Sequence, residues 1–200
     1  MMTILYEVGK NLYINLTNKC PCNCTFCIRN NGDGAYGSDS LWLEREPTVD
    51  EVISALKEKS LDDYDEIIFC GYGEPTESLD SLVEVGKFLK STTKTIVRLN
   101  TNGLSDLIHG EKTAHKLVSA VDVVSVSLNA GTKDEYLKVT LPSFGEKSYD
   151  AMLDFASDCK DNGLKVMFSI VDVIPKEEIE KCKEISTERG ITLRIRPYDA

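Results

Sequence analysis

Six short apolar runs alternate with amphipathic helical patterns along the 200 residues of the chain, and this alternation limits the folds that it can adopt. Runs of β-branched and other apolar residues bounded by turn residues predict strands. The predicted strands cover residues 12–17, 67–70, 95–100, 121–128, 165–173 and 191–196. Parallel neighbours need crossover connections, which helices supply. The pattern predicts an α/β protein with a parallel sheet, and six strands are too few for a closed eight-stranded barrel. An open, partial (β/α)6 barrel of the TIM type fits.

The segments between the predicted strands carry helix signals. Thr48–Glu51 and Thr132–Glu135 have the sequence of a capping box, which opens a helix, and Gly163 and Gly190 suit helix C-terminal caps. Further predicted helices cover residues 79–89, 112–120, 148–162 and 176–189, and the helix that begins at Thr48 continues to about residue 59. Base rates favour an extra edge strand within residues 1–10. The length suits one domain spanning residues 1–200.

Polar and glycine-rich segments follow the predicted strands. They are the cysteine loop 20–27, the turn 71–75, the segments 100–103 and 127–129, and Arg196. Binding sites of barrels and open parallel sheets lie at the carboxyl ends of the strands. We therefore expect these segments to meet at one rim of the barrel.

Three of the seven cysteines, Cys20, Cys24 and Cys27, have the spacing C-x3-C-x2-C directly after the first predicted strand. Three thiolates can hold three irons of a [4Fe–4S] cluster, for which four is the usual number. The remaining iron then keeps open positions for a small molecule, as catalytic metal sites do. A zinc site is the alternative, but it would need a fourth ligand, commonly in a second matched pair. His109 and His115 are isolated in the sequence.

The other four cysteines fall outside this spacing. Cys22 lies within the loop, and Cys70 ends the second predicted strand, close to the expected rim. Cys159 and Cys182 lie in predicted helices, where buried cysteines are common packing residues. Cys22 could replace a neighbouring cysteine as a ligand, but the C-x3-C-x2-C spacing leaves it spare; the roles of Cys22 and Cys70 stay open.

The turn Gly71-Tyr-Gly-Glu-Pro75 follows the second predicted strand. Glycines let a backbone approach a ligand closely, and Pro75 fixes the exit of the turn. Backbone carbonyls at such a turn can accept hydrogen bonds from an ammonium group, and Glu74 adds a complementary charge. An ordinary strand-to-helix turn is the alternative for a motif this short. Its place behind the cysteine loop favours a ligand site.

Together, the cysteine loop and this turn resemble the radical S-adenosylmethionine (SAM) enzymes. In that family an aromatic residue precedes the last cysteine, here Phe26, and a Gly-Gly-Glu-Pro motif receives the SAM amino group. The matching turn residues here are Gly71, Tyr72, Gly73, Glu74 and Pro75, with Tyr72 in place of the more frequent second glycine. Within the family, the chain resembles the small TatD-associated radical SAM proteins. The stretches that carry this resemblance are residues 12–30, 41–48, 69–76, 100–110 and 194–198.

The resemblance implies two cofactors, a [4Fe–4S] cluster and SAM, whose amine and carboxylate bind the fourth iron. Reductive cleavage of SAM would give a 5′-deoxyadenosyl radical that abstracts hydrogen from a substrate. The positions that it implies for SAM contacts are Asn100, Thr101, Asn102, Ser127 and Asn129. Turn chemistry alone can explain Asn102-Gly103.

Arg196 can meet a carboxylate or phosphate through its planar fork, and we include it among the cofactor contacts. A salt bridge in an acidic protein is an equal alternative for this residue. Beyond the cluster itself, we assign no catalytic residue, because no side chain is identified as a general acid or base.

The net charge of −10 disfavours non-specific binding to nucleic acid or membranes. No run approaches the roughly 18 apolar residues of a membrane helix, and no secretory signal is visible. Seven cysteines in a chain that is not exported indicate metal ligands or reduced thiols rather than disulfides. With the predicted cluster, the setting that we expect is cytoplasmic and low in oxygen. Its electron donor would be a protein such as flavodoxin or ferredoxin.

The substrate is unidentified. An open barrel side can admit a large substrate or a partner protein, whereas a nucleoside or small metabolite is the alternative. The association with TatD nucleases suggests a nucleic-acid substrate, but the negative net charge of the chain weakens this suggestion. The loop 31–46, with Trp42, either shields the cluster or forms part of the substrate site. Two rival functions stay open: a non-catalytic Fe–S electron-transfer or sensor protein, and a protein that binds SAM without turnover.

Overall fold

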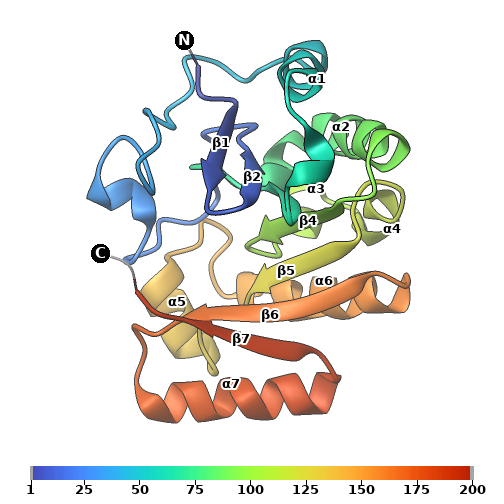
Figure 1. The fold of residues 1–200 in the computed structure, drawn as a ribbon. Coiled ribbons are helices and arrows are strands. Elements are labelled where there is room, and N and C mark those ends of the chain that lie inside the picture. The colour runs from blue at the N-terminus through green and yellow to red at the C-terminus, as the bar shows by residue number, and fades with distance from the viewer. Residues whose placement is uncertain (1, 199–200) are drawn as a thin grey trace.

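One curved sheet of seven strands organises the computed structural model, which describes residues 2–198 (Figure 1). The strand order in space, β1 to β7, is the order along the chain. The strands are β1 (Leu5–Val8), β2 (Asn11–Ile14), β3 (Glu66–Phe69), β4 (Ile96–Thr101), β5 (Val123–Ser127), β6 (Lys165–Val171) and β7 (Thr192–Arg196). β1 pairs antiparallel with β2, and all later neighbours are parallel. The six predicted strands and the edge strand are confirmed; Met1 lies outside the described residues.

Seven α-helices and three 3-10 turns connect these strands within residues 2–198. The α-helices are α1 (Val49–Lys57), α2 (Leu79–Thr92), α3 (Ser105–His109), α4 (Ala114–Leu117), α5 (Lys133–Thr140), α6 (Lys147–Asp161) and α7 (Lys176–Arg189). The 3-10 turns are η1 (Ile28–Asn31), η2 (Leu61–Asp63) and η3 (Pro75–Ser78). At least one α-helix lies between each two consecutive parallel strands, as crossover connections require.

The helix predicted over residues 112–120 is present but shorter, as α4, and α3 precedes it where the sequence predicted no helix. Gly110, with a left-handed φ of 68°, ends α3. The Asp106 carboxylate then accepts hydrogen bonds from the backbone N–H and the hydroxyl of Thr113, at 2.9 and 2.8 Å. These bonds hold a turn between α3 and α4 that the helical pattern of the sequence did not reveal.

The two predicted capping boxes have different outcomes. At α1 both halves form, because the Thr48 side chain accepts from the Glu51 N–H and the Glu51 carboxylate accepts from the Thr48 N–H. At α5 the Thr132 side chain caps the helix, but its backbone N–H donates to Glu178 at 2.8 Å. Glu178 comes from α7 and takes the place that Glu135 was expected to fill.

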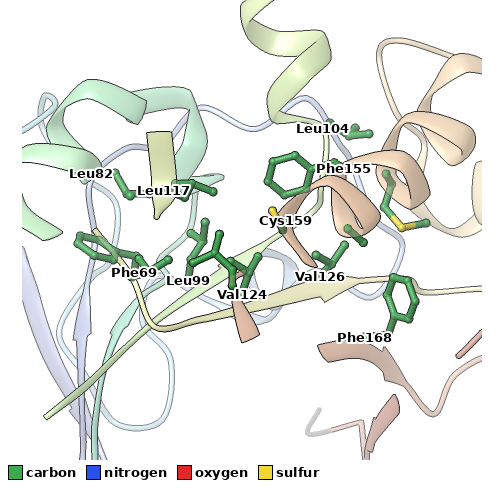
Figure 2. Packing of buried hydrophobic residues seen from close by; sticks show 14 of the residues in the cluster. Phe69, Leu82, Leu99, Leu104, Leu117, Val124, Val126, Phe155, Cys159 and Phe168 are labelled. Atoms are coloured by element: carbon green, nitrogen blue, oxygen red, sulfur yellow. The ribbon is translucent and has the colours of Figure 1, made fainter. Parts of the chain in front are cut away.

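Alternate strand residues on one face of the sheet pack against the helices. Figure 2 shows Phe69, Leu99, Val124, Val126 and Phe168 of the strands gathered with side chains of the helices. The helix side chains labelled there include Leu82, Leu117, Phe155 and Cys159. Cys159 and Cys182 are fully buried in this core, as expected of packing residues.

The opposite face of the sheet is polar toward the carboxyl ends of the strands. Its residues alternate with the core residues, because successive strand side chains point to opposite faces. Register pairs Asn100 with Ser125, and pairs Ser169 with both Ser127 and Arg194. This concave face lies next to the segments that the sequence predicts to meet at one rim.

No helix within residues 2–198 is both long and apolar enough to cross a membrane.

Candidate functional site

The cysteine loop leaves β2 and is fastened to a distant part of the chain. The backbone N–H of Asn23 donates to the Thr140 carbonyl at 3.0 Å, and that of Thr25 donates to the Val139 carbonyl at 2.9 Å. The Ser143 N–H donates in turn to the Pro21 carbonyl at 2.7 Å. The loop is therefore held by the carboxyl end of α5 and the segment after it. The spacing of the cysteines gives no signal of these contacts.

Four thiols crowd this loop. Cys20, Cys24 and Cys27 are partly exposed, whereas Cys22 is buried between its neighbours. A hydrogen bond with Cys22 is the main cause that lowers the pKa of both Cys20 and Cys24, and the same bonds raise the pKa of Cys22. This pattern favours thiolates at Cys20 and Cys24 and a protonated thiol at Cys22.

A cation and an indole ring lie beside the third predicted ligand. The Arg29 Nε donates to the Cys27 Sγ at 3.4 Å, and a second guanidinium nitrogen donates to the Cys22 carbonyl at 3.2 Å. The guanidinium also lies over the Trp42 ring, 5.9 Å from its centre. A positive charge at this position favours thiolates and anionic ligands nearby. Arg29 was not among the residues that the sequence singled out.

The donor set of the loop suits an iron–sulfur cluster better than a single ion. Within residues 2–198, no three His, Cys, Asp or Glu side chains converge as they would around one metal ion. A four-iron cluster takes each thiolate on a separate iron, so its ligands need not meet at a point. Cys20, Cys24 and Cys27 therefore fit a [4Fe–4S] cluster in chemistry and number, with one iron left for another ligand.

The turn Gly71–Pro75 packs directly on the segment that leads from β2 to Cys20. A Cβ atom added at Gly73 would lie 2.2 Å from the Thr17 carbonyl oxygen, and one added at Gly71 would lie 2.0 Å from the Asn15 Oδ1. The Glu74 N–H donates to the Lys19 carbonyl at 2.8 Å. Only glycine leaves room for this approach, so the two predicted site segments form one wall.

The Glu74 carboxylate has partners that the sequence did not predict. It is 4% exposed, and its oxygens accept from the Thr76 N–H and hydroxyl, at 3.1 and 2.8 Å. They also accept from the Thr101 hydroxyl and the Asn102 N–H, both at 2.7 Å. Burial raises the pKa of Glu74, and these four donors oppose the rise. All four bonds fix the turn and the end of β4. They do not test the predicted charge complementarity between Glu74 and a ligand ammonium group, which stays a prediction.

Tyr72 points away from the wall toward the loop 31–46. Its hydroxyl donates to the carbonyls of Gly32 and Gly34, at 2.7 and 3.0 Å. Its ring meets that of Trp42 edge-on at 5.0 Å between centroids. The residue that stands where the resembling family more often has glycine thus anchors the long loop over the site.

The remaining predicted contacts divide between two places. Asn102 Nδ2 lies 3.9 Å from the sulfurs of Cys20 and Cys22. Asn100 and Ser127 lie on the concave face, whereas the Thr101 hydroxyl is committed to Glu74 on the other side of β4.

Asn129, after β5, is 7% exposed and has a left-handed φ of 60°, which asparagine tolerates. Phe26 is half-buried against the core, and Pro75 is buried at the start of η3.

The sequence missed three neighbours on the concave face: Ser125, Ser169 and Arg194. Ser125 and Ser169 are 6% and 5% exposed, and Arg194 pairs in register with Ser169. A period of two, applied to the predicted strands, would have placed them opposite the apolar residues.

Cys70 and Arg196 follow or end strands whose side chains at these positions face the concave side of the sheet. Burial raises the pKa of the Cys70 thiol, whereas a hydrogen bond with Asn100 and the charge of Arg196 lower it. The Arg196 Nε is buried and has no hydrogen-bond partner within residues 2–198. A buried N–H group without a partner at the rim can donate a hydrogen bond to an acceptor atom of a ligand.

A parallel half-barrel with thiols and a glycine turn at its carboxyl rim defines an α/β protein built to hold a cofactor there. The Radical SAM superfamily profile matches residues 14–187, and the chain belongs to this family. The family uses a [4Fe–4S] cluster and SAM, and its members are enzymes that need a reductant and a substrate.

The curated relatives include GTP 3′,8-cyclase of Clostridium perfringens (strain 13 / Type A). It is 25% identical over 187 residues, which are 92% of this chain and 54% of the relative. The chain therefore spans about half the length of the curated relatives that it matches.

Solved structures with the same fold include native anSMEcpe with bound AdoMet, with a TM-score of 0.65 and 18% identity over 94% of this chain and 50% of that one. The FeFe-hydrogenase maturase HydG from Carboxydothermus hydrogenoformans also has a TM-score of 0.65, with 16% identity over 95% of this chain and 44% of that one. These likenesses establish the partial barrel fold.

Proposed function

We propose that this chain is a radical SAM enzyme in which Cys20, Cys24 and Cys27 hold the [4Fe–4S] cluster. The observation that carries the proposal is the packing of the Gly73 turn on the segment leading to Cys20, where a Cβ would lie 2.2 Å from the Thr17 carbonyl oxygen. It places the proposed amine-binding turn beside the proposed cluster loop. When bound, the reduced cluster supplies the electron that cleaves SAM to methionine and a 5′-deoxyadenosyl radical.

The chain's own residues bind and orient SAM in this proposal. Backbone carbonyls of the turn 71–74 accept hydrogen bonds from its ammonium group, and Glu74 fixes their direction through its bonds to Thr101 and Asn102. Ser127 ends β5 and Asn129 follows it, and both would contact the ribose and carboxylate. The loop 31–46, anchored by Tyr72, keeps water from the site.

Three finer assignments rest on the sequence resemblance. We assign residues 1–200 to a single radical SAM core domain of the TatD-associated group. We also assign a protein such as flavodoxin or ferredoxin as the electron donor. No residue is assigned as a general acid or base, because no titratable side chain faces a known substrate.

For the substrate, we favour a small anionic molecule over a partner protein. Arg194 and Arg196 share the concave face with Ser169, and the Arg196 Nε is buried without a partner among the described residues. Planar guanidinium groups suit phosphate and carboxylate. The relatives' name specifies GTP, a nucleotide of this kind.

The reconstituted protein tests this preference through equilibrium binding of GTP. Arg194→Gln should weaken binding about tenfold, as expected for one charge-assisted hydrogen bond. Lys165→Gln is the matched control, because Lys165 lies on the same face at the other end of β6. Binding of a protein partner with no binding of nucleotides would reverse the preference.

The rival function is that of a non-catalytic iron–sulfur protein, either an electron-transfer protein or a sensor, that does not use SAM. Anaerobic reconstitution, followed by iron and sulfide analysis and EPR of the reduced protein with and without SAM, separates the two. We expect four irons per chain and a spectrum that changes on adding SAM. Cys24→Ala should lose the cluster, and Cys182→Ala, in α7, should keep it. A cluster with an unchanged spectrum favours the rival, and bound zinc contradicts both.

A further inference from the structure

A buried phenol without a partner lies behind the cysteine loop. Tyr136, in α5, is 1% exposed, and its hydroxyl has no hydrogen-bond partner within residues 2–198. Leaving a buried hydroxyl unpaired is unfavourable, because the group loses its hydrogen bonds to water. Such a group calls for an acceptor from outside the part of the chain that the structure describes.

The position of α5 brings this phenol to the thiols. The last residues of α5, Val139 and Thr140, accept the backbone hydrogen bonds of the cysteine loop, and Pro142 forms a β-bridge with Cys22. Tyr136 lies one turn before Thr140. It belongs to the same buried cluster as Cys22, against which Cys20 and Cys24 also pack.

Electrostatics agree with this placement. Burial is the main cause that raises the pKa of Tyr136; the charges of Cys22, Cys24 and Cys20 raise it further, whereas Thr140 lowers it. The phenol therefore keeps its proton and is available as a donor. The nearby Thr140 hydroxyl already donates to the Tyr136 carbonyl at 2.7 Å.

We propose that the Tyr136 hydroxyl donates a hydrogen bond to the cluster from the α5 side of the cysteine loop and thereby stabilises its reduced form. The inference rests on the proposed cluster site. Reduction adds negative charge to the cluster sulfurs, so a donor aimed at them favours the reduced state and raises the reduction potential. The effect acts on the step that every round of SAM cleavage needs, the arrival of one electron.

A neighbouring tyrosine provides the matched control. The rings of Tyr136 and Tyr149 lie 5.3 Å apart between centroids. The charged groups that shift the pKa of Tyr149 are Cys182, Glu178, Arg189 and Asp150. The Tyr149 hydroxyl therefore lies away from the cysteine loop, and its removal changes the same aromatic pair without touching the cluster.

The test is a redox titration of the reconstituted protein, followed by EPR. In Tyr136→Phe, the equilibrium constant for one-electron reduction of the cluster should fall about threefold to tenfold. A tenfold fall corresponds to a reduction potential about 59 mV more negative. Tyr149→Phe should keep the original potential. An unchanged or more positive potential in Tyr136→Phe, at equal iron content, overturns the proposal.

A second variant covers the case in which Tyr136→Phe fails to assemble a cluster. Site-specific replacement Tyr136→3-fluorotyrosine keeps the ring and makes the hydroxyl a stronger donor, so the potential should become more positive. An unchanged potential in this variant also overturns the proposal. A protein that titrates as expected but does not bind SAM contradicts only the proposed enzymatic function, whereas one that assembles no cluster contradicts both.

Discussion

The Thr101 hydroxyl at the end of β4 donates a 2.7 Å hydrogen bond to the Glu74 carboxylate in the turn after β3. The same carboxylate accepts from the Asn102 N–H, and the Asn102 side chain reaches the sulfurs of Cys20 and Cys22. One buried carboxylate thus links two strand ends to the cysteine loop. Its main effect is to hold the rim in shape.

Glu74→Gln should therefore destabilise the protein by about 1–3 kcal/mol, because one carboxylate oxygen becomes an amide that faces a buried donor. Chemical denaturation measures the loss. SAM affinity of the reconstituted protein should fall as well, since the turn is no longer held. Glu77→Gln, in the same turn, is the control and should change neither. Unaltered stability in Glu74→Gln would contradict the role in the rim.

Gly73→Ala should prevent the turn from packing on the cysteine loop. Its Cβ would lie 2.2 Å from the Thr17 carbonyl oxygen and 2.7 Å from that of Lys19, both backbone atoms that cannot rotate away. We expect reduced cluster content per folded molecule and loss of SAM binding. Gly86→Ala is a matched clash, 2.5 Å from the Ala120 carbonyl oxygen, and should lower stability while leaving cluster content unchanged.

Tyr72→Phe should release the loop 31–46 without damaging the rim. It removes two hydrogen bonds to loop carbonyls, at 2.7 and 3.0 Å, at a cost of about 1 kcal/mol. Hydrogen exchange should accelerate at Gly32 and Gly34 and their neighbours. Tyr36 is 55% exposed, so Tyr36→Phe should leave exchange as it is, and equal protection in both variants would count against the anchor.

The contacts of Glu51, at the start of α1 just after this loop, should stabilise the protein less in acid. Bonds from Arg45 and the Thr48 N–H lower the pKa of Glu51 from 4.5 to about 2. Because the folded protein holds the proton less tightly than the unfolded chain, this stabilisation is complete above pH 4.5 and disappears as the pH falls to about 2.

Glu51→Gln should thus be less stable than the unsubstituted protein at pH 7 and equally stable near pH 2. Denaturation midpoints across this pH range check the expectation. A difference that stays constant with pH would contradict it.

Much of the fold was predictable, because parallel strands buried on both faces, as β3 is at Ile67–Phe69, leave nearly continuous apolar runs in the sequence. The helix over residues 176–189 was predicted to the residue, since Gly190 marks its end. The cysteine loop and the turn 71–75 were predicted as neighbours from their places after successive strands.

The features of the site that the sequence did not predict depend on contacts between residues far apart in the chain. The backbone bonds from the cysteine loop to Val139 and Thr140 carry no side-chain signature. Tyr136 resembles any core aromatic of an amphipathic helix, and only its unpaired hydroxyl distinguishes it. Glu178 displaced Glu135 as a capping partner because the fold brings α7 to the start of α5, over 40 residues earlier in the chain.

The most direct test of the proposed function is formation of 5′-deoxyadenosine. The protein is purified and reconstituted without oxygen, reduced with dithionite and given SAM, and the nucleoside is quantified beside Cys24→Ala and Cys182→Ala. We expect 5′-deoxyadenosine from the unsubstituted protein and from Cys182→Ala, and none from Cys24→Ala. A fully loaded cluster that yields no 5′-deoxyadenosine, or a yield that survives Cys24→Ala, would contradict the assignment.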